Sequence, residues 1–185
     1  MPGYSGERSE PKSQKGPDRT PEAWRAAGRQ ICLRLLTVEP RTRAQLADAM
    51  HRRGVPEDAA DDVLNTLSDA RLIDDAAFAK AWVESRHYAR GLSLRNLQQE
   101  LRQRGVAADD IDMAVDTLDP EQETETARRL TERKLAATRG QPAATRVRKV
   151  AGLLARKGYP AGLAFRLIRE AMEAEGTEFG DFPDE

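Results

Sequence analysis

The chain has 185 residues, of which 39% are hydrophobic, 33% are charged and only 5% are aromatic. No run approaches the roughly 18 apolar residues that a membrane-spanning helix needs, and no apolar stretch follows the charged N-terminus. A membrane protein and a signal peptide are therefore not expected. The single cysteine excludes an internal disulfide, which predicts a cytoplasmic protein.

The net charge of −1 conceals an uneven distribution. Residues 120–173 carry 12 Lys and Arg against 6 Asp and Glu, whereas residues 74–119 carry 6 against 9. Residues 174–185 carry five acidic residues and no basic one. Either these charges form an ordinary solvated surface, or the basic and acidic regions present polarised faces to a partner.

The first 20 residues mix Pro, Gly, Ser and charge without apolar periodicity, which predicts a disordered arm. A helix start follows, with Thr20 as N-cap and Pro21 at the first helical position. Apolar residues then recur at helical spacing through residues 24–36. This pattern predicts a first amphipathic helix.

The next segment predicts two more helices. Thr42 with Gln45 three residues later forms a capping box, and Gly54 ends the helix that it opens. Pro56 begins a third helix whose first turns are acidic, as the helix dipole favours. Alternating strand patterns are nearly absent, so we expect an all-α fold.

This three-helix pattern recurs twice. Gly54, Gly105 and Gly158 lie 51 and 53 residues apart, and a basic residue directly precedes each of them. Apolar residues occupy the same five positions relative to each glycine, which indicates an internal repeat. They are Leu46, Leu97 and Val150; Met50, Leu101 and Leu154; Ala60, Ile111 and Ala164; Leu64, Val115 and Ile168; and Leu67, Leu118 and Ala171.

Each later copy also has a helix ahead of the aligned pair. The second copy has it at residues 75–89, and the third starts it at Asp119-Pro120. Units of about 50 residues bury little surface alone, so we expect them to stack into an elongated, curved array. The predicted segments are a disordered arm (1–20), three three-helix repeats (21–73, 74–119 and 120–174) and an acidic C-terminal tail (175–185).

Few residues could support catalysis or bind a metal. The only histidines, His51 and His87, lie in polar stretches and are predicted to be on the surface. Cys32 is predicted to be a buried small hydrophobic residue. Asp74 and Asp75 are more typical of a helix start than of an acid–base pair. We therefore expect no enzymatic activity, no metal site and no cofactor.

Binding is the expected function, and recurrent basic residues are the candidate contacts. Aromatic residues for base stacking are not evident, because Trp24, Phe78, Trp82 and Phe165 are at predicted core positions. The candidate partner-binding residues are Arg86, Arg95, Arg102, Arg104, Arg146, Arg148, Lys149, Arg156 and Lys157.

Two segments resemble the signature of the RecX family of bacterial proteins. They are residues 72–83 (LIDDAAFAKAWV), followed by Ser85, Arg86 and Gly91, and residues 97–106 (LQQELRQRGV). The resemblance covers roughly residues 22–174. One departure is Gly158-Tyr159-Pro160 in the third repeat, where the other two repeats have Gly-Val.

This resemblance implies a non-enzymatic, cytoplasmic and monomeric regulator that binds the RecA recombinase, chiefly its filament on DNA. Such a regulator lies in the groove of the filament and contacts more than one protomer. It suppresses ATP hydrolysis, strand exchange and co-protease activity, and so modulates recombination, DNA repair and the SOS response. The family supplies no catalytic residues.

Two alternatives stay open from the residues alone. The basic third repeat is compatible with a helical module that binds nucleic acid directly, and weak binding to DNA could accompany binding to a filament that contains DNA. A generic helical adaptor for an unrelated protein is the other alternative.

Overall fold

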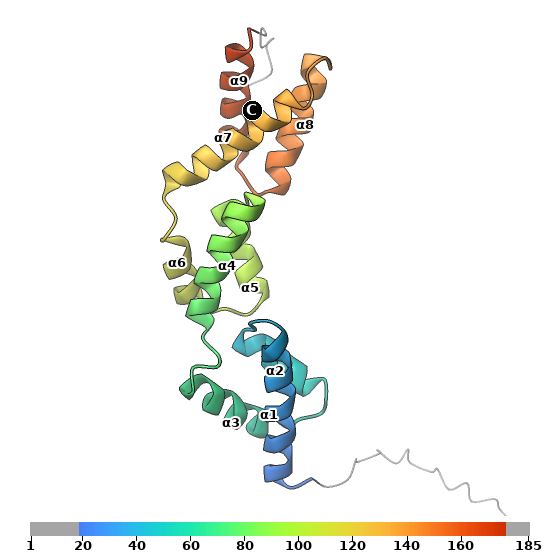
Figure 1. The fold of residues 1–185 in the computed structure, drawn as a ribbon, viewed down its shortest axis with the longest axis vertical. Helices are drawn as coiled ribbons and strands as arrows, with labels where there is room; N and C mark the ends of the chain where they lie inside the picture. Colours follow the sequence, from blue (N-terminus) through green and yellow to red (C-terminus); the bar gives the residue numbers. More distant parts are fainter. Residues whose placement is uncertain (1–18, 177–185) are drawn as a thin grey trace, which may run out of the picture.

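The computed structural model describes residues 19–176, which form nine α-helices and no strand. The helices make three units that succeed one another along the longest axis of the molecule (Figure 1). Unit 1 contains α1 (Pro21–Val38), α2 (Arg43–His51) and α3 (Glu57–Asp69); unit 2 contains α4 (Asp75–Arg90), α5 (Leu94–Gln103) and α6 (Ala108–Val115); unit 3 contains α7 (Pro120–Ala136), α8 (Ala143–Arg156) and α9 (Ala161–Ala174).

The prediction of an elongated all-α array of three-helix units is thus confirmed for the described part of the chain. The predicted arm falls almost entirely, and the predicted acidic tail largely, outside the described residues. No helix within residues 19–176 combines the length and the apolar character needed to cross a membrane.

The predicted helix starts are confirmed by their hydrogen bonds. The Thr20 hydroxyl accepts from the N–H of Ala23 at 3.3 Å, and Thr42 and Gln45 form both bonds of the capping box. The Asp74 carboxylate likewise accepts from the N–H of Ala77 at 2.8 Å, so it is a helix cap. Side-chain caps of this kind stabilise a helix by about 1 kcal/mol each.

The repeated glycines close the middle helices α2, α5 and α8. Their φ angles are +76° at Gly54, +73° at Gly105 and +88° at Gly158. This left-handed conformation strains residues that have a Cβ atom by about 1–2 kcal/mol, so the turn selects glycine. The glycines that align the repeats are therefore the residues that fix the end of the same helix in each unit.

Each unit has its own hydrophobic core. All of the aligned apolar residues are buried except Ala171, which is half-buried. Helices pack closely along their sides only within their own unit. The aromatic predictions hold in part: Trp24, Phe78 and Trp82 pack half-buried against the cores, but Phe165 is 39% exposed because it lies beside the buried stripe of α9.

The first junction, between units 1 and 2, is made by polar groups at helix ends. The Thr42 hydroxyl, at the start of α2, donates to the carbonyl oxygen of Arg104 at 2.6 Å. The N–H of Arg43 donates to Oδ1 of Asp75 in the first turn of α4 at 2.9 Å. The start of α2 is thus held by the end of α5 and by a carboxylate of α4.

The second junction, between units 2 and 3, repeats this arrangement. The N–H of Ser93, at the start of α5, donates to the carbonyl oxygen of Lys157 at 2.9 Å. The N–H of Leu94 donates to Oε1 of Glu123 in α7 at 2.9 Å. Ser93 lies 12 residues before Gly105, as Thr42 lies 12 residues before Gly54, so equivalent helix starts make both junctions.

The glycine that ends the receiving helix also permits close approach at both junctions. A Cβ atom at Gly105 would lie 2.3 Å from Cβ of Ala44, and one at Gly158 would lie 2.4 Å from side-chain oxygens of Ser93 and Asn96. Such distances are far inside van der Waals contact. Glycine therefore serves both the turn and the packing of one unit on the next.

The second junction adds buried side-chain contacts at the end of α4. His87 is fully buried, with Nδ1 3.0 Å from the carbonyl oxygen of Leu92 and Nε2 3.1 Å from the hydroxyl oxygen of Thr126. The buried Tyr159 hydroxyl donates to the carbonyl oxygen of Gly91 at 3.1 Å. The prediction that His87 is a surface residue is wrong, because unit 3 covers the last turn of α4.

Candidate partner-binding surface

The structure separates the nine predicted contact residues into three groups. Five side chains are exposed, three are half-buried and one is buried. The exposed residues are Arg95, Arg102, Arg148, Lys149 and Arg156; the half-buried residues are Arg86, Arg104 and Lys157; and the buried residue is Arg146.

Arg146 does not lie on the surface, contrary to the sequence-based expectation. Its side chain is 6% exposed, pairs with the carboxylate of Glu175 at 2.5 Å and donates to the carbonyl oxygen of Leu135 at 3.2 Å. The helix α8 begins about one turn earlier, relative to its terminal glycine, than α2 and α5 do. Arg146 is thereby placed inside the helix, where it ties α8 to the ends of α7 and α9.

Two of the predicted arginines meet at one tryptophan. The guanidinium carbons of Arg86 and Arg104 lie 4.1 and 3.8 Å from the ring centroid of Trp82, which indicates cation–π contacts. The indole N–H donates to Glu100 at 2.8 Å, and the ring of Phe78 stacks at 5.6 Å. Burial lowers the pKa of Arg104, as does the charge of Arg86, while Glu100 opposes both effects.

This cluster lies beside a groove of about 690 Å³ between unit 1 and α4. Arg86 and Arg90, one helical turn apart on α4, both line the groove. The wall from unit 1 includes Leu36, Pro40 and Arg41. The groove therefore combines an apolar floor with basic side chains.

A second hollow, of about 660 Å³, lies where α4 ends against unit 3. Four basic residues line it, Arg90, Arg129, Arg133 and Lys157, and no carboxylate does. Lys157 also donates to the carbonyl oxygen of Arg90. Burial lowers the pKa of Lys157, and the charges of Arg133, Arg90 and Arg156 lower it further. The electrostatic potential here is therefore positive and suits an anionic group.

Together these side chains form one continuous surface, which we name the basic stripe: Arg104, Trp82, Arg86, Arg90, Arg133 and Lys157. It runs along α4 from unit 2 into unit 3. The sequence prediction included Arg86, Arg104 and Lys157 but missed Arg90 and Arg133. Arg90 could have been found from its position four residues after Arg86 on the same helix face.

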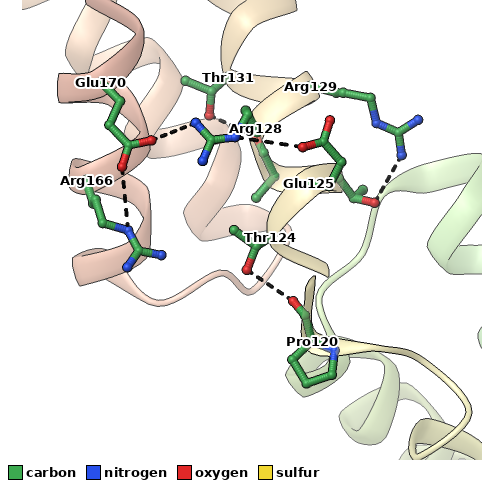
Figure 2. Close-up of polar contacts among 10 residues, drawn as sticks. Pro120, Thr124, Glu125, Arg128, Arg129, Thr131, Arg166 and Glu170 are labelled. Atoms are coloured by element: carbon green, nitrogen blue, oxygen red, sulfur yellow. Dashed lines mark hydrogen bonds and ion pairs between the residues drawn. The ribbon is translucent and has the colours of Figure 1, made fainter. Parts of the chain in front are cut away.

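Not every basic residue of unit 3 is free to meet a partner. Figure 2 shows Arg128 of α7 between two carboxylates, at 2.6 Å from Glu170 of α9 and 3.8 Å from Glu125. The hydrogen bond from Glu170 raises the pKa of Arg128. Arg166 approaches Glu170 from α9 itself, at 4.0 Å. Part of the positive charge of this unit therefore joins α7 to α9.

The exposed face of α8 carries a separate basic patch. Arg148, Lys149 and Arg156 are exposed, and Lys149 donates to the side chain of Gln141 at 2.7 Å. Arg148 also lines a groove of about 540 Å³ whose walls are mainly alanines and Phe165.

The residues tested for chemistry have structural surroundings. Cys32 is fully buried, and burial raises the pKa of its thiol to about 11, so it is a thiol at neutral pH. His51 is exposed, as predicted. Within residues 19–176, no group of three or more His, Cys, Asp or Glu side chains is placed to hold a metal ion.

The fold and this surface define a class: a tandem array of three-helix units that presents a basic stripe across two of its units. Family models match all three units. The first three-helix domain of RecX matches residues 29–67, the second matches residues 74–115 and the third matches residues 121–168.

Full-length relatives agree. The chain is 56% identical to the regulatory protein RecX of Thermobifida fusca over 168 residues, which is 91% of this chain and 90% of that protein. It is 53% identical to the regulatory protein RecX of Streptomyces lividans over 181 residues, or 97% and 95% of the two chains. The chain belongs to the RecX family of regulatory proteins.

Solved structures show the same fold. The crystal structure of RecX from Lactobacillus salivarius superimposes with a TM-score of 0.70 at 20% identity, over 80% of this chain and 96% of that one. A second crystal structure of a regulatory protein RecX gives a TM-score of 0.70 at 27% identity, over 80% and 74% of the two chains.

Proposed function

We propose that this RecX family chain binds RecA, chiefly as the filament on DNA, and inhibits its ATPase, strand-exchange and co-protease activities. It would thereby modulate recombination, DNA repair and the SOS response. In this proposal the chain acts in the cytoplasm as a monomer, without cofactor and without catalysis of its own. Its family membership and the signature in residues 72–106 support the identity of the partner.

The observation that carries the proposal is the basic stripe on an elongated array. It offers both exposed cations and a desolvated aromatic–arginine cluster, which are the side chains that dominate protein interfaces. Because the stripe crosses from unit 2 to unit 3, one chain can contact more than one subunit of a helical assembly. A ligand that bridges subunits shifts the assembly toward the state that it binds better.

The test is the DNA-dependent ATPase of RecA with increasing amounts of this protein. We expect inhibition at substoichiometric protein, and no inhibition at saturating protein would refute the function. The assay is run on preformed filaments and on assembling RecA. Stronger inhibition of assembly would show that growth is blocked, whereas equal inhibition would show action on the finished filament.

A paired variant tests the surface. Arg90→Gln with Arg133→Gln removes two charges from the stripe, and Arg29→Gln with Arg34→Gln removes two exposed charges from α1 as the matched control. The first pair should require about tenfold more protein for half inhibition, as expected for the loss of about 1.4 kcal/mol of binding. Equal inhibition by both pairs would place the contact face elsewhere.

Direct binding of nucleic acid is a second candidate function, favoured by the hollow that four cations line without a carboxylate. Binding of a labelled single-stranded oligonucleotide should weaken steeply with salt, because each neutralised phosphate releases counterions. Each lost phosphate contact should reduce the slope of log K against log salt by about 0.7. A shallow slope that the Arg90 and Arg133 variants leave unchanged would argue against this function.

A further inference from the structure

The middle helices of the three units are coupled end to end. The start of α2 sits on the end of α5, and the start of α5 sits on the end of α8. At each contact the carbonyl that precedes a repeated glycine accepts a hydrogen bond from the N-cap residue of the incoming helix. The first helical N–H of the incoming helix donates to a carboxylate in the opening turns of the neighbouring unit.

Helix electrostatics favour this arrangement. The end of a helix carries a partial negative charge and its start a partial positive charge, so the stacked helices align their dipoles head to tail. The carboxylates of Asp75 and Glu123 add full negative charge beside the incoming helix starts. The coupling therefore specifies its occupant: the N-terminus of a helix, with a hydroxyl residue as N-cap and a free N–H after it.

Unit 1 retains the same features without an internal occupant. Gly54 has the same left-handed φ of +76°, and no described atom lies within 4 Å of the position that its Cβ would take. Arg53 and Gly54 are exposed, and the first turn of α1 supplies an exposed carboxylate, Glu22. We name the Arg53–Gly54 turn with Glu22 the open end. Figure 1 shows it in the half of unit 1 away from unit 2.

A second copy of this chain offers no matching helix start at its own free ends. Pro142 precedes α8 and has no hydroxyl, and Arg146, which aligns with Thr42 and Ser93, is buried inside α8. Thr20 caps α1, but Pro21 follows it and has no N–H to donate to a carboxylate. The array is therefore closed at unit 3 and open at unit 1.

We propose that the open end binds the N-terminus of a helix in a partner protein, with Ser or Thr at the N-cap and a residue other than proline after it. The cap residue bonds to the carbonyl oxygen of Arg53, as cap residues bond to those of Arg104 and Lys157. The next N–H bonds to Glu22. This site lies outside the basic stripe and does not depend on the identity of the partner proposed above.

The probe is a synthetic peptide of residues 91–104, which contains the Ser93-capped start of α5, held helical by a side-chain crosslink. It is added at millimolar concentration to the isotope-labelled full chain, and amide shifts are followed by NMR. We expect saturable shifts at Gly54 and Val55. A peptide with Leu94→Pro should shift them at least several-fold less, because it lacks the donated N–H.

Two matched variants of the full chain complete the test. Gly54→Asn places a side chain on the open end, while Gly140→Asn places one at another open glycine of similar φ, +85°. Asn tolerates this conformation, so both variants should keep nearly the thermal midpoint of the parent. The proposal predicts that Gly54→Asn alone abolishes the shifts.

Other outcomes overturn the proposal. Absence of shifts at millimolar peptide, or shifts that survive Gly54→Asn, would show that the open end does not bind helix starts. Concentration-dependent dimerisation in ultracentrifugation that Gly54→Asn abolishes would show that the occupant is a second copy. The peptide result is independent of the RecA assay, so failure of one proposal is distinguishable from failure of the other.

Discussion

The two junctions between units share a framework of main-chain contacts and differ in the side chains added to it. In both, a helix start donates to the carbonyl before a glycine and to a carboxylate of the next unit. Only the second junction adds buried side-chain contacts, from Tyr159 to the carbonyl of Gly91 and from His87 to Thr126.

This difference separates architecture from elaboration. The shared bonds come from positions that the repeat conserves in spacing, so they set how units stack. Tyr159 occupies the position where units 1 and 2 have Val55 and Val106, and it reaches the end of α4. The second junction is thereby fixed from both sides, and the basic stripe that crosses it is held in one geometry.

The largest effect is expected from Leu101→Ala. Leu101 is fully buried in α5, whose start makes the second junction and whose end makes the first. The cavity should lower the free energy of unfolding by about 2–5 kcal/mol. Chemical denaturation measures it. A loss below about 1 kcal/mol would show that unit 2 does not depend on this core.

Gly105→Ala should be the next most damaging change and should affect the first junction. The new Cβ would meet Cβ of Ala44, which cannot move without α2, so overpacking adds about 1–3 kcal/mol to the strain of the positive φ. Gly158→Ala meets side-chain ends of Ser93 and Asn96, which can rotate, and should cost less. Gly140→Ala, with no neighbour within 4 Å among described atoms, measures the strain alone. Equal losses for all three variants would contradict the close packing.

Tyr159→Phe tests the added contact of the second junction. It leaves the buried carbonyl of Gly91 without its donor, which should lower the free energy of unfolding by about 1–2 kcal/mol. Tyr88→Phe is the control, because Tyr88 is 66% exposed and should change stability by less than about 0.5 kcal/mol. Both are measured by thermal and chemical denaturation, and equal effects would remove Tyr159 from the account of the junction.

The smallest effect is expected from Asp75→Asn at the first junction. Burial raises the pKa of Asp75, and the hydrogen bond from the N–H of Arg43 offsets this only in part. The folded chain therefore holds the proton to higher pH than the unfolded chain. Its stabilising contribution is complete below the ordinary pKa, near 4, and is lost as pH rises through the raised pKa.

Asn keeps an acceptor for Arg43 and does not titrate. The stability of Asp75→Asn relative to the parent should therefore increase as pH rises through this range, by less than about 1 kcal/mol. Denaturation curves at a series of acidic pH values measure the difference, with the exposed Asp109→Asn as control. A relative stability that falls with pH would contradict the direction given for Asp75.

Local signals made much of the fold predictable. Caps at Thr20, Thr42 and Asp74, and glycines that end helices, act within a few residues of their own position, so the sequence contains all the information that they need. The apolar periodicity around each glycine likewise predicted the three cores. These features together predicted the number of units and their order.

The unpredicted features depend on which helix ends meet. His87 stands in a polar stretch, yet its burial depends on Thr126, 39 residues away. Arg146 looked like a surface cation, yet Glu175, 29 residues away, neutralises it. The basic stripe has the same origin, because Arg133 and Lys157 join Arg90 only when unit 3 docks on α4. Spacing along the chain does not encode such encounters.

The position of α5 has a consequence for how the molecule opens. Loss of α5 breaks both junctions at once, whereas loss of α2 or α8 breaks one. In a linear array with nearest-neighbour coupling, the middle unit is therefore the most protected against local opening, and the ends fray first. Amide hydrogens of α5 should exchange more slowly than those of the outer units, and the middle unit should set the cooperativity of unfolding.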